Sequence, residues 1–151
     1  MPYIKWTDDY STGIDVIDSQ HKRIIHYINQ LADAQALKES RLVTEVLINL
    51  IDYTLSHFAF EESLMEEAGY IGAIVHKKTH DGFRDKIMEY QKKHNAGVDV
   101  SEDLTRLLNI WLMNHISEDD SSYAPVVREK IQGINAAEKQ GWLKHMAGRF
   151  F

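Results

Sequence analysis

Two pairs of residues in the middle of the chain have the types and the spacing of metal ligands. His57 and Glu61 are four residues apart, and so are His76 and His80. On an α-helix, residues at this spacing lie one turn apart on the same face, so each pair can direct two ligating groups at one point. Gly69 lies between the pairs and predicts a helix end, which would place them on adjacent antiparallel helices. This part of the chain therefore predicts a metal site.

Further histidines indicate that every helix contributes a ligand. A lone histidine near an apolar face is more often a structural residue than a ligand, and we interpret His26, His94 and His145 in that way. His21 and His115 differ because they add candidates from the first and the last long helix, and His115 has acidic neighbours. Burial of so many imidazoles and carboxylates with nothing to bind would cost several kcal/mol in desolvation. The set as a whole predicts bound metal.

The donor types restrict the metal without fixing it. The chain has no cysteine, so thiolate sites and disulfides are excluded. Imidazole and carboxylate ligands suit iron, zinc, copper or manganese. The sequence HKKTH at His76 lacks the glutamate base of zinc proteases, and no histidine has a glutamate three residues before it, as oxidase-type di-iron bundles do. The number of candidate ligands suits two ions, and neutral imidazoles are expected to favour reversible chemistry over oxygen activation.

Apolar residues recur at three- and four-residue spacing along most of the chain, which is the pattern of amphipathic helices. The four expected helices cover residues 18–37, 40–67, 71–93 and from 101 through His115. Their candidate N-terminal caps are Asp18 or Ser19, Ser40 and Ser101, and Pro125 is expected to end or kink the last helix. The inner side of the third helix is expected to carry Ile74, Val75, Phe83, Ile87 and Tyr90.

The predicted fold class is all-α, an up-down-up-down four-helix bundle, because long helices with short connections pack in that way. Residues 1 to 17 have few helix signals, and their aromatic side chains predict an extended arm packed on the bundle. We expect one domain over residues 1–151, with the bundle at about 18–123 and a C-terminal extension at about 124–151. From about Asn135 the extension is expected to form a short extra helix with Trp142, Leu143, Met146 and Phe150 on one side.

The composition argues against several classes of function. A formal net charge of -6, with no run of more than two basic residues, argues against nucleic-acid binding. The first residues lack the features of a secretory signal, and no apolar run approaches the roughly 20 residues of a membrane span. We expect a soluble, cytoplasmic protein that is a monomer or a weak dimer.

Several motifs stand in a fixed order between residues 6 and 123. The sequence HFAFE begins at His57, and HKKTH begins at His76. The sequence WLMNHI begins at Trp111 and is followed by Asp120 and Tyr123. Upstream of them stand Trp6, Tyr10, Gly13, Ile14, Ile17, Asp18, Gln20 and His21. This set resembles the hemerythrin family, and within it the bacteriohemerythrins, with the family's HFxxE, HxxxH and WLxxHIxxxD motifs in place.

The resemblance implies a non-haem centre of two iron ions joined by an oxo or hydroxo bridge. The implied ligands are His76, His80 and His115 on one iron, His21 and His57 on the other, and Glu61 and Asp120 bridging both. Three terminal ligands and three bridges fill an octahedron, whereas two terminal ligands and three bridges leave one position open. Dioxygen is expected to bind reversibly at that open position.

Helical geometry and the family pattern disagree about the acidic partner of His115. Asp119 lies four residues later, about 40° around the helix, whereas Asp120 lies five residues later, about 140° away. The family pattern selects Asp120, which implies a wide turn or a helix that ends near Ser117. Asp119 therefore stays an alternative.

The resemblance also implies an apolar dioxygen pocket that excludes water and slows autoxidation. Leu112, one turn before His115, is the expected gate. The expected lining is Ile24, Phe58, Trp111, Leu112 and Ile116, although each of these could equally be ordinary core.

The function implied is reversible dioxygen binding, for storage or for delivery to an oxygen-consuming enzyme, without enzymatic activity of its own. Oxygen or redox sensing through a partner protein is one alternative. A peroxidase-like or nitric-oxide-handling di-iron enzyme is another, although we expect no acid or base in the pocket apart from the ligands. Residues after Tyr123 are expected to pack on the bundle rather than to form a dimer or partner contact.

Overall fold

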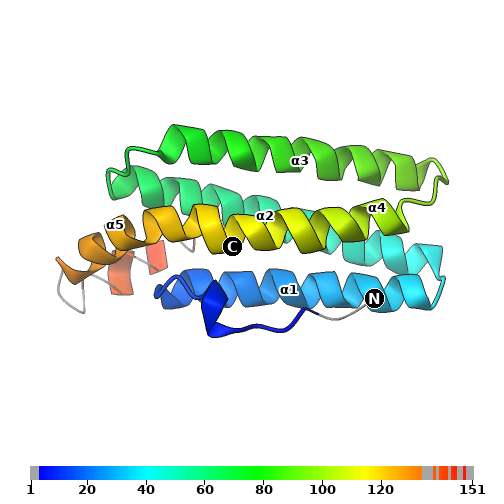
Figure 1. Cartoon of the computed structure of the whole chain (residues 1–151), viewed down its shortest axis with the longest axis horizontal. Helices are drawn as coiled ribbons and strands as arrows, with labels where there is room; N and C mark the ends of the chain where they lie inside the picture. Colours follow the sequence, from blue (N-terminus) through cyan, green and yellow to red (C-terminus); the bar gives the residue numbers. More distant parts are fainter. Residues whose placement is uncertain (1–3, 134–137, 139, 143, 146–147, 149–151) are drawn as a thin grey trace.

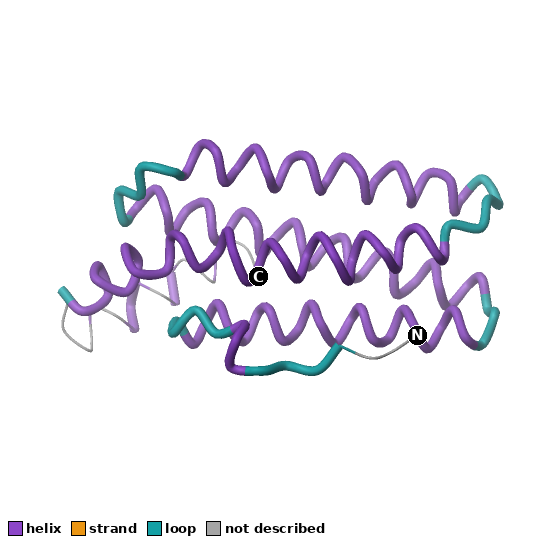
Figure 2. The backbone as a smooth tube through the Cα atoms, in the orientation of Figure 1, coloured by secondary structure: helices purple, strands orange, loops and turns teal. Residues whose placement is uncertain are grey.

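Long helices that alternate in direction build the molecule, as Figure 1 shows for the computed structural model. The structure describes residues 4–133, 138, 140–142, 144–145 and 148. The helices are α1 (Asp15–Ala36), α2 (Ser40–Glu67), α3 (Ala73–Asn95), α4 (Ser101–Arg106), η2 (Leu107–Leu112), η3 (His115–Asp120) and α5 (Ser121–Gln132), preceded by the short turn η1 (Asp8–Tyr10). The described residues contain no strand, and loops lie only before α1 and between the helices (Figure 2). The predicted four-helix bundle is therefore confirmed.

The fourth helix of the bundle is one continuous helical segment whose hydrogen-bonding pattern changes along its length. It begins as α4, passes through the π-helical segments η2 and η3, and ends as α5. A π-helix bonds residue i to residue i+5 and is wider than an α-helix. The segment does not end at Pro125, which lies inside α5. No apolar repeat in the sequence signals these wide turns.

Glycine at a left-handed position ends α2 as the sequence predicted. Gly69 has a φ of 71°. Its N–H donates to the carbonyl of Glu66, and the N–H of Tyr70 donates to the carbonyl of Met65. This pair of bonds is a Schellman motif, which needs a residue with positive φ after the helix. The motif turns the chain from α2 into α3 and brings their ligand pairs together.

The predicted helix caps are not observed. Ser40 and Ser101 are instead the first residues of α2 and α4, one residue after the cap positions Glu39 and Val100. α1 begins at Asp15, three residues before the expected start. Asp18 is instead a buried acceptor inside the helix, 2.8 Å from both the backbone nitrogen and the hydroxyl of Thr12. It fastens the preceding loop to α1.

The N-terminal arm packs on the bundle as predicted. Ile4 exchanges two backbone hydrogen bonds of 3.0 Å with the side-chain amide of Asn29 on α1. Trp6 and Tyr10 are partly buried against the main core, with ring centroids 5.9 Å apart. The arm is therefore held by both polar and apolar contacts.

Two separate apolar clusters form the core. The larger cluster joins α1, α2, α3 and the fourth helix and includes Ile28, Leu47 and Phe83. The smaller cluster lies near the start of α1 and includes Phe60 and Tyr123. Buried histidines and carboxylates of all four helices belong to neither cluster. The polar site therefore divides the core.

The start of α3 differs from the sequence prediction. Ile74 and Val75 were expected to face inward, but they are 74% and 70% exposed. His76 is buried, and residues one or two positions before it lie about 100° and 200° around the helix. The two apolar side chains therefore face outward because His76 faces inward.

The C-terminal extension is described only in part. Trp142 is half-buried and packs against the smaller core cluster, which supports packing of the extension on the bundle. The expected partners Leu143, Met146 and Phe150 lie outside the described residues. Among the helices that are described, none is long and apolar enough to cross a membrane.

Candidate metal centre

Each helix of the bundle directs polar side chains into its interior at one level. α1 contributes His21, α2 contributes His57 and Glu61, α3 contributes His76 and His80, and η3 contributes His115 and Asp120. All seven are buried. The structure thus brings together every residue that the sequence analysis named as a ligand.

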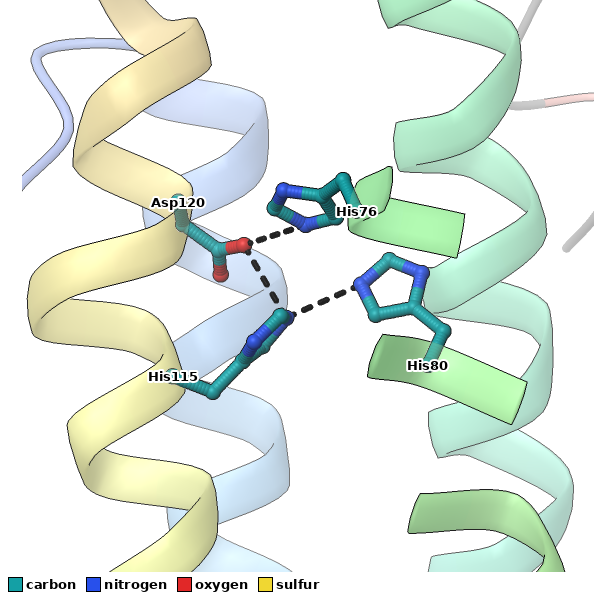
Figure 3. Close-up of side chains that lie close together, drawn as sticks. All are labelled: His76, His80, His115 and Asp120. Atoms are coloured by element: carbon teal, nitrogen blue, oxygen red, sulfur yellow. Dashed lines mark hydrogen bonds and ion pairs between the residues drawn. The ribbon is translucent and has the colours of Figure 1, made fainter. Parts of the chain in front are cut away.

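The ligand atoms form two overlapping groups. The three-histidine group is His76, His80, His115 and Asp120, and Figure 3 shows these side chains converging from two helices. The two-histidine group is His21, His57, Glu61 and Asp120. In each group, one ligand atom per residue lies within 4.8 Å of all the others. This spacing suits one metal ion in each group.

Asp120 presents a different oxygen to each group. Its Oδ2 lies 3.0 Å from Nε2 of His21, in the two-histidine group. Its Oδ1 lies 2.9 Å from Nε2 of His76 and 3.3 Å from Nε2 of His115, in the three-histidine group. A carboxylate oriented in this way can bridge two ions.

Glu61 has the same orientation. Its Oε1 contacts Nε2 of His57 and lies 3.6 Å from Nε2 of His21. Its Oε2 lies 3.6 Å from Nε2 of His76, which belongs to the other group. The two carboxylates therefore lie between the groups, each with one oxygen toward either side.

The wide turn of η3 resolves the conflict over Asp119 and Asp120. The π-helical segment begins at His115 and ends at Asp120, so residues five apart come onto one face. Asp120 is fully buried, whereas the side chain of Asp119 is 48% exposed. Asp119 lies 2.7 Å from the other ring nitrogen of His115, Nδ1. Both acids thus contact His115, one from inside the bundle and one from outside.

Two further polar residues contact the histidines without facing the centre. The side-chain oxygen of Gln20 lies 2.6 Å from Nδ1 of His57, and both residues are buried. Glu62 lies 3.5 Å from Nδ1 of His80. The sequence analysis assigned no role to Gln20 or Glu62, although each directly neighbours a predicted ligand in the chain. That adjacency was a signal for both residues, and Gln20 also stands among the residues that carry the resemblance to hemerythrins.

Electrostatics favour protonated imidazoles where both carboxylates are close. Burial disfavours a positive charge on His21, but Asp120 and Glu61 outweigh it and raise the pKa of His21 to about 9. The same balance raises the pKa of His76 to about 9. Protons on these imidazoles supply positive charge that the two buried carboxylates require. A metal cation would supply it in their place.

Burial dominates at two other histidines. It lowers the pKa of His57 despite the attraction of Glu61, and it lowers the pKa of His115 despite Asp120. Burial opposes ionisation of Glu61 as well, but its close contacts with the imidazoles of His57, His21 and His76 hold the pKa of that carboxyl well below its usual range. Neutral imidazoles and an ionised carboxylate are the forms that bind metal.

Buried atoms that lack a hydrogen-bond partner support the assignment of a metal site. Within the described part of the chain, no hydrogen bond reaches Nε2 of His21 or His76, or either carboxylate oxygen of Glu61 and Asp120. Buried polar atoms almost always have a hydrogen-bond partner. Where several buried atoms without one point at the same place, a metal ion that binds between them supplies the missing partner. Because these atoms face each other and carry lone pairs or negative charge, the residues fit two cations such as iron.

Aromatic rings flank the three-histidine group. Phe58 stacks on His80 with ring centroids 3.9 Å apart, and Trp111 stacks on His115 at 5.0 Å. The resemblance implied that both rings lie near the open position, which belongs to the two-histidine group. Phe58 does reach His57, at a centroid distance of 6.1 Å. The other expected lining residues, Ile24, Leu112 and Ile116, are buried in the larger core cluster.

Tyr123 places a phenol beside the centre. Its ring is fully buried and lies 5.4 Å from the ring of His76, centroid to centroid. Burial and the carboxylates of Glu61 and Asp120 raise its pKa well above the usual value, so the hydroxyl keeps its proton. Among the described residues its oxygen has no partner with hydrogen-bond geometry. We expected no acid or base in the dioxygen pocket apart from the ligands; Tyr123 is a weak acid that lies beside the three-histidine group, in the smaller core cluster.

Comparisons with known proteins agree with this geometry. The family model described as hemerythrin HHE cation binding domain matches residues 12–127. The bacteriohemerythrin of Pseudomonas aeruginosa is 48% identical over 152 residues, which span 100% of this chain and 99% of that protein. The bacteriohemerythrin of Methylococcus capsulatus is 36% identical and spans 83% of this chain and 97% of that protein.

A solved structure has the same fold. The crystal structure of a wild-type hemerythrin matches with a TM-score of 0.80 and 35% sequence identity. The match covers 83% of this chain and 98% of that chain. With a matching family model, close relatives over its full length and a matching structure, this chain belongs to the hemerythrin family.

Proposed function

We propose that this chain binds dioxygen reversibly at two non-haem iron ions, for oxygen storage or for delivery to an oxygen-consuming enzyme. The observation that carries the proposal is the pair of shared carboxylates. Glu61 and Asp120 each direct one oxygen toward the three-histidine group and the other toward the two-histidine group. Such an arrangement suits two adjacent ions better than a single one.

The ligands divide unequally between the two positions. Three imidazoles serve one position and two serve the other, while both carboxylates are common to the two. Bound iron would supply the electrons that dioxygen takes up, and the position with fewer protein ligands would be the one accessible to it. Five imidazoles against two carboxylates make a mostly neutral donor set, which supports reversible binding rather than catalysis.

The surroundings of the centre support the same function. Ile24, Leu112 and Ile116 are buried and apolar, so they exclude water from the side of the larger core cluster. Water and protons would let dioxygen that has taken up electrons leave as hydrogen peroxide, and the irons would then stay oxidised. An apolar wall is therefore what a reversible carrier requires.

Metal analysis combined with dioxygen uptake tests the proposal. The ferrous full-length chain should contain two irons and take up one dioxygen per pair, and a stream of argon should release it. Glu61→Gln should lower iron content and abolish uptake, because it removes a charge shared by both positions. Glu66→Gln, which alters an exposed glutamate of the same helix, is the matched control and should change neither. A wild-type chain with fewer than two irons, or without uptake, would overturn the proposal.

A further inference from the structure

The two metal positions differ in the residue that contacts the outer ring nitrogen, Nδ1, of one of their histidines. Asp119, a carboxylate, lies 2.7 Å from Nδ1 of His115 in the three-histidine group. Gln20, a neutral amide, lies 2.6 Å from Nδ1 of His57 in the two-histidine group. The contacts are similar in length but differ by one negative charge.

Both contacts fix the tautomer of the ring. An ionised carboxylate can only accept, so Nδ1 of His115 carries the proton and donates it to Asp119. The oxygen of Gln20 faces Nδ1 of His57, which likewise donates. In both rings the lone pair is then on Nε2, the atom that faces the centre. Each outer contact thus prepares its imidazole to bind metal.

The charge of the outer partner changes how strongly an imidazole donates. A hydrogen bond to an anion is stronger than one to a neutral acceptor and leaves more electron density on the ring. His115 should therefore be a stronger donor than His57. Stronger donation stabilises a bound cation and favours its more oxidised form.

We propose that Asp119 is a positioning residue which acts through His115 and, in contrast with Gln20, adds to the difference between the two metal positions that their unequal number of imidazoles already creates. The three-histidine position binds metal more tightly and holds ferric iron more readily than the two-histidine position. This inference rests on the proposed two-iron site, and it adds to that site a difference in affinity and potential between its halves.

The location of Asp119 permits a clean test. Its side chain is about half exposed, so a substitution there creates no buried cavity. Asparagine retains an oxygen that accepts from Nδ1, which means that Asp119→Asn removes the charge and keeps the contact. Asp119→Ala removes both. Asp103→Asn, which alters an exposed carboxylate of the same helical segment, is the matched control.

The experiment has two measurements on the full-length chain. Anaerobic titration of the metal-free protein with ferrous iron gives the affinity of each position. Asp119→Ala should weaken one of the two by about 10- to 100-fold, the usual effect of losing an outer partner. Redox titration of the iron-loaded protein should show a higher midpoint potential for one iron in Asp119→Asn. Gln20→Glu, which adds a charge behind His57, should lower the potential of the other iron.

The outcomes separate this inference from the proposed function. If wild type binds two irons and the Asp119 variants have unchanged affinities and potentials, the inference fails and the two-iron site stands. Equal shifts in Asp119→Asn and Asp103→Asn would also overturn it, because they would reflect net charge alone. A wild-type chain that binds no iron would overturn both. Should Gln20→Glu not fold, the Asp119 series decides the question.

Discussion

At the residue scale, His115 illustrates how the centre is built. Its Nε2 lies 3.3 Å from Oδ1 of Asp120 inside the bundle, and its Nδ1 lies 2.7 Å from Asp119 at the surface. Trp111 stacks on one face of its ring. The imidazole is thus held at both nitrogens and on its face. A ligand fixed in this way needs little rearrangement when a metal binds.

Leu112→Ala should leave iron content unchanged and accelerate autoxidation severalfold. Leu112 is 1% exposed and lies one turn before His115 in the chain. Truncation opens a cavity through which water can approach the centre, and it should also cost roughly 2–5 kcal/mol of stability. Stopped-flow or slow optical recording of the oxygenated protein measures the autoxidation rate.

Leu108→Ala is the control for this truncation. Leu108 is also 1% exposed and belongs to the same core cluster, one turn farther from His115. It should lose similar stability with little change in autoxidation. An unchanged rate in Leu112→Ala, or equal acceleration in both variants, would contradict the gating role.

All seven candidate ligands could be named from the sequence, but of their outer partners only Asp119 was considered, and then as an alternative ligand. The i, i+4 pairs and the family motifs located residues such as His57 and His76. The choice between Asp119 and Asp120 depended on a π-helical turn, which leaves no mark in the apolar repeat. Gln20 contacts His57 and Tyr123 contacts His76, each on another helix, and a single sequence does not reveal contacts between helices.

At the element scale, the ends of α1 and α2 place different residue types in the left-handed backbone conformation. After α2, Gly69 occupies this conformation with a φ of 71°. After α1, Lys38 occupies it with a φ of 57°. A side chain at positive φ costs roughly 1–2 kcal/mol, and glycine avoids that cost. The turn after α2 therefore avoids this cost, whereas the turn after α1 does not.

Lys38→Gly should raise the free energy of unfolding by about 1 kcal/mol, because it relieves this backbone strain. Gly69→Ala should lower it by a similar amount, since an added methyl group there meets no atom within 4 Å and acts through the backbone alone. Urea unfolding measures both. Changes of the same sign in the two variants would refute the explanation.

Gly82→Ala should stabilise the protein by about 0.5–1 kcal/mol, the difference in helix propensity between the two residues. Gly82 lies inside α3 and is exposed, and a methyl group added there meets nothing within 4 Å. The same urea experiment applies. A loss of stability would contradict this account, because helix propensity is the one difference it allows between the two residues.

Helix identity was more predictable than helix ends. Apolar spacing located four helices because each must bury one face. The predicted start of α1 was wrong, because Asp18 accepts hydrogen bonds from the preceding loop instead of capping the helix. The predicted start of α2 was right, but the cap position is Glu39 and not Ser40. Ile74 and Val75 were misplaced because the buried His76, not the apolar residues, sets the inner face of α3 there.

At the scale of the whole molecule, the centre replaces apolar packing across the middle of the bundle. Two core clusters lie on either side of it, and neither includes the seven candidate ligands. Buried charges without a counter-ion weaken a core, whereas bound metal joins all four helices. Stability should therefore depend on metal.

Removal of iron should lower the thermal midpoint without abolishing the fold. Each ion present at 100 times its dissociation constant adds about 2.7 kcal/mol to the stability of the folded state. Circular dichroism can follow unfolding of the ferrous protein under argon and of the same protein after treatment with a chelator. The metal-free chain should remain helical because both apolar clusters persist. Equal midpoints would contradict the role of the metal in holding the helices together.

The most direct test of the central claim is the visible absorption spectrum of the ferrous protein before air, after air and after argon. The ferrous form should be nearly colourless, air should produce a visible band, and argon should remove it over repeated cycles. This reversal requires bound iron that gives electrons to dioxygen as it binds and recovers them as it leaves. A spectrum that does not respond to air, or a band that argon cannot remove, would contradict reversible dioxygen binding.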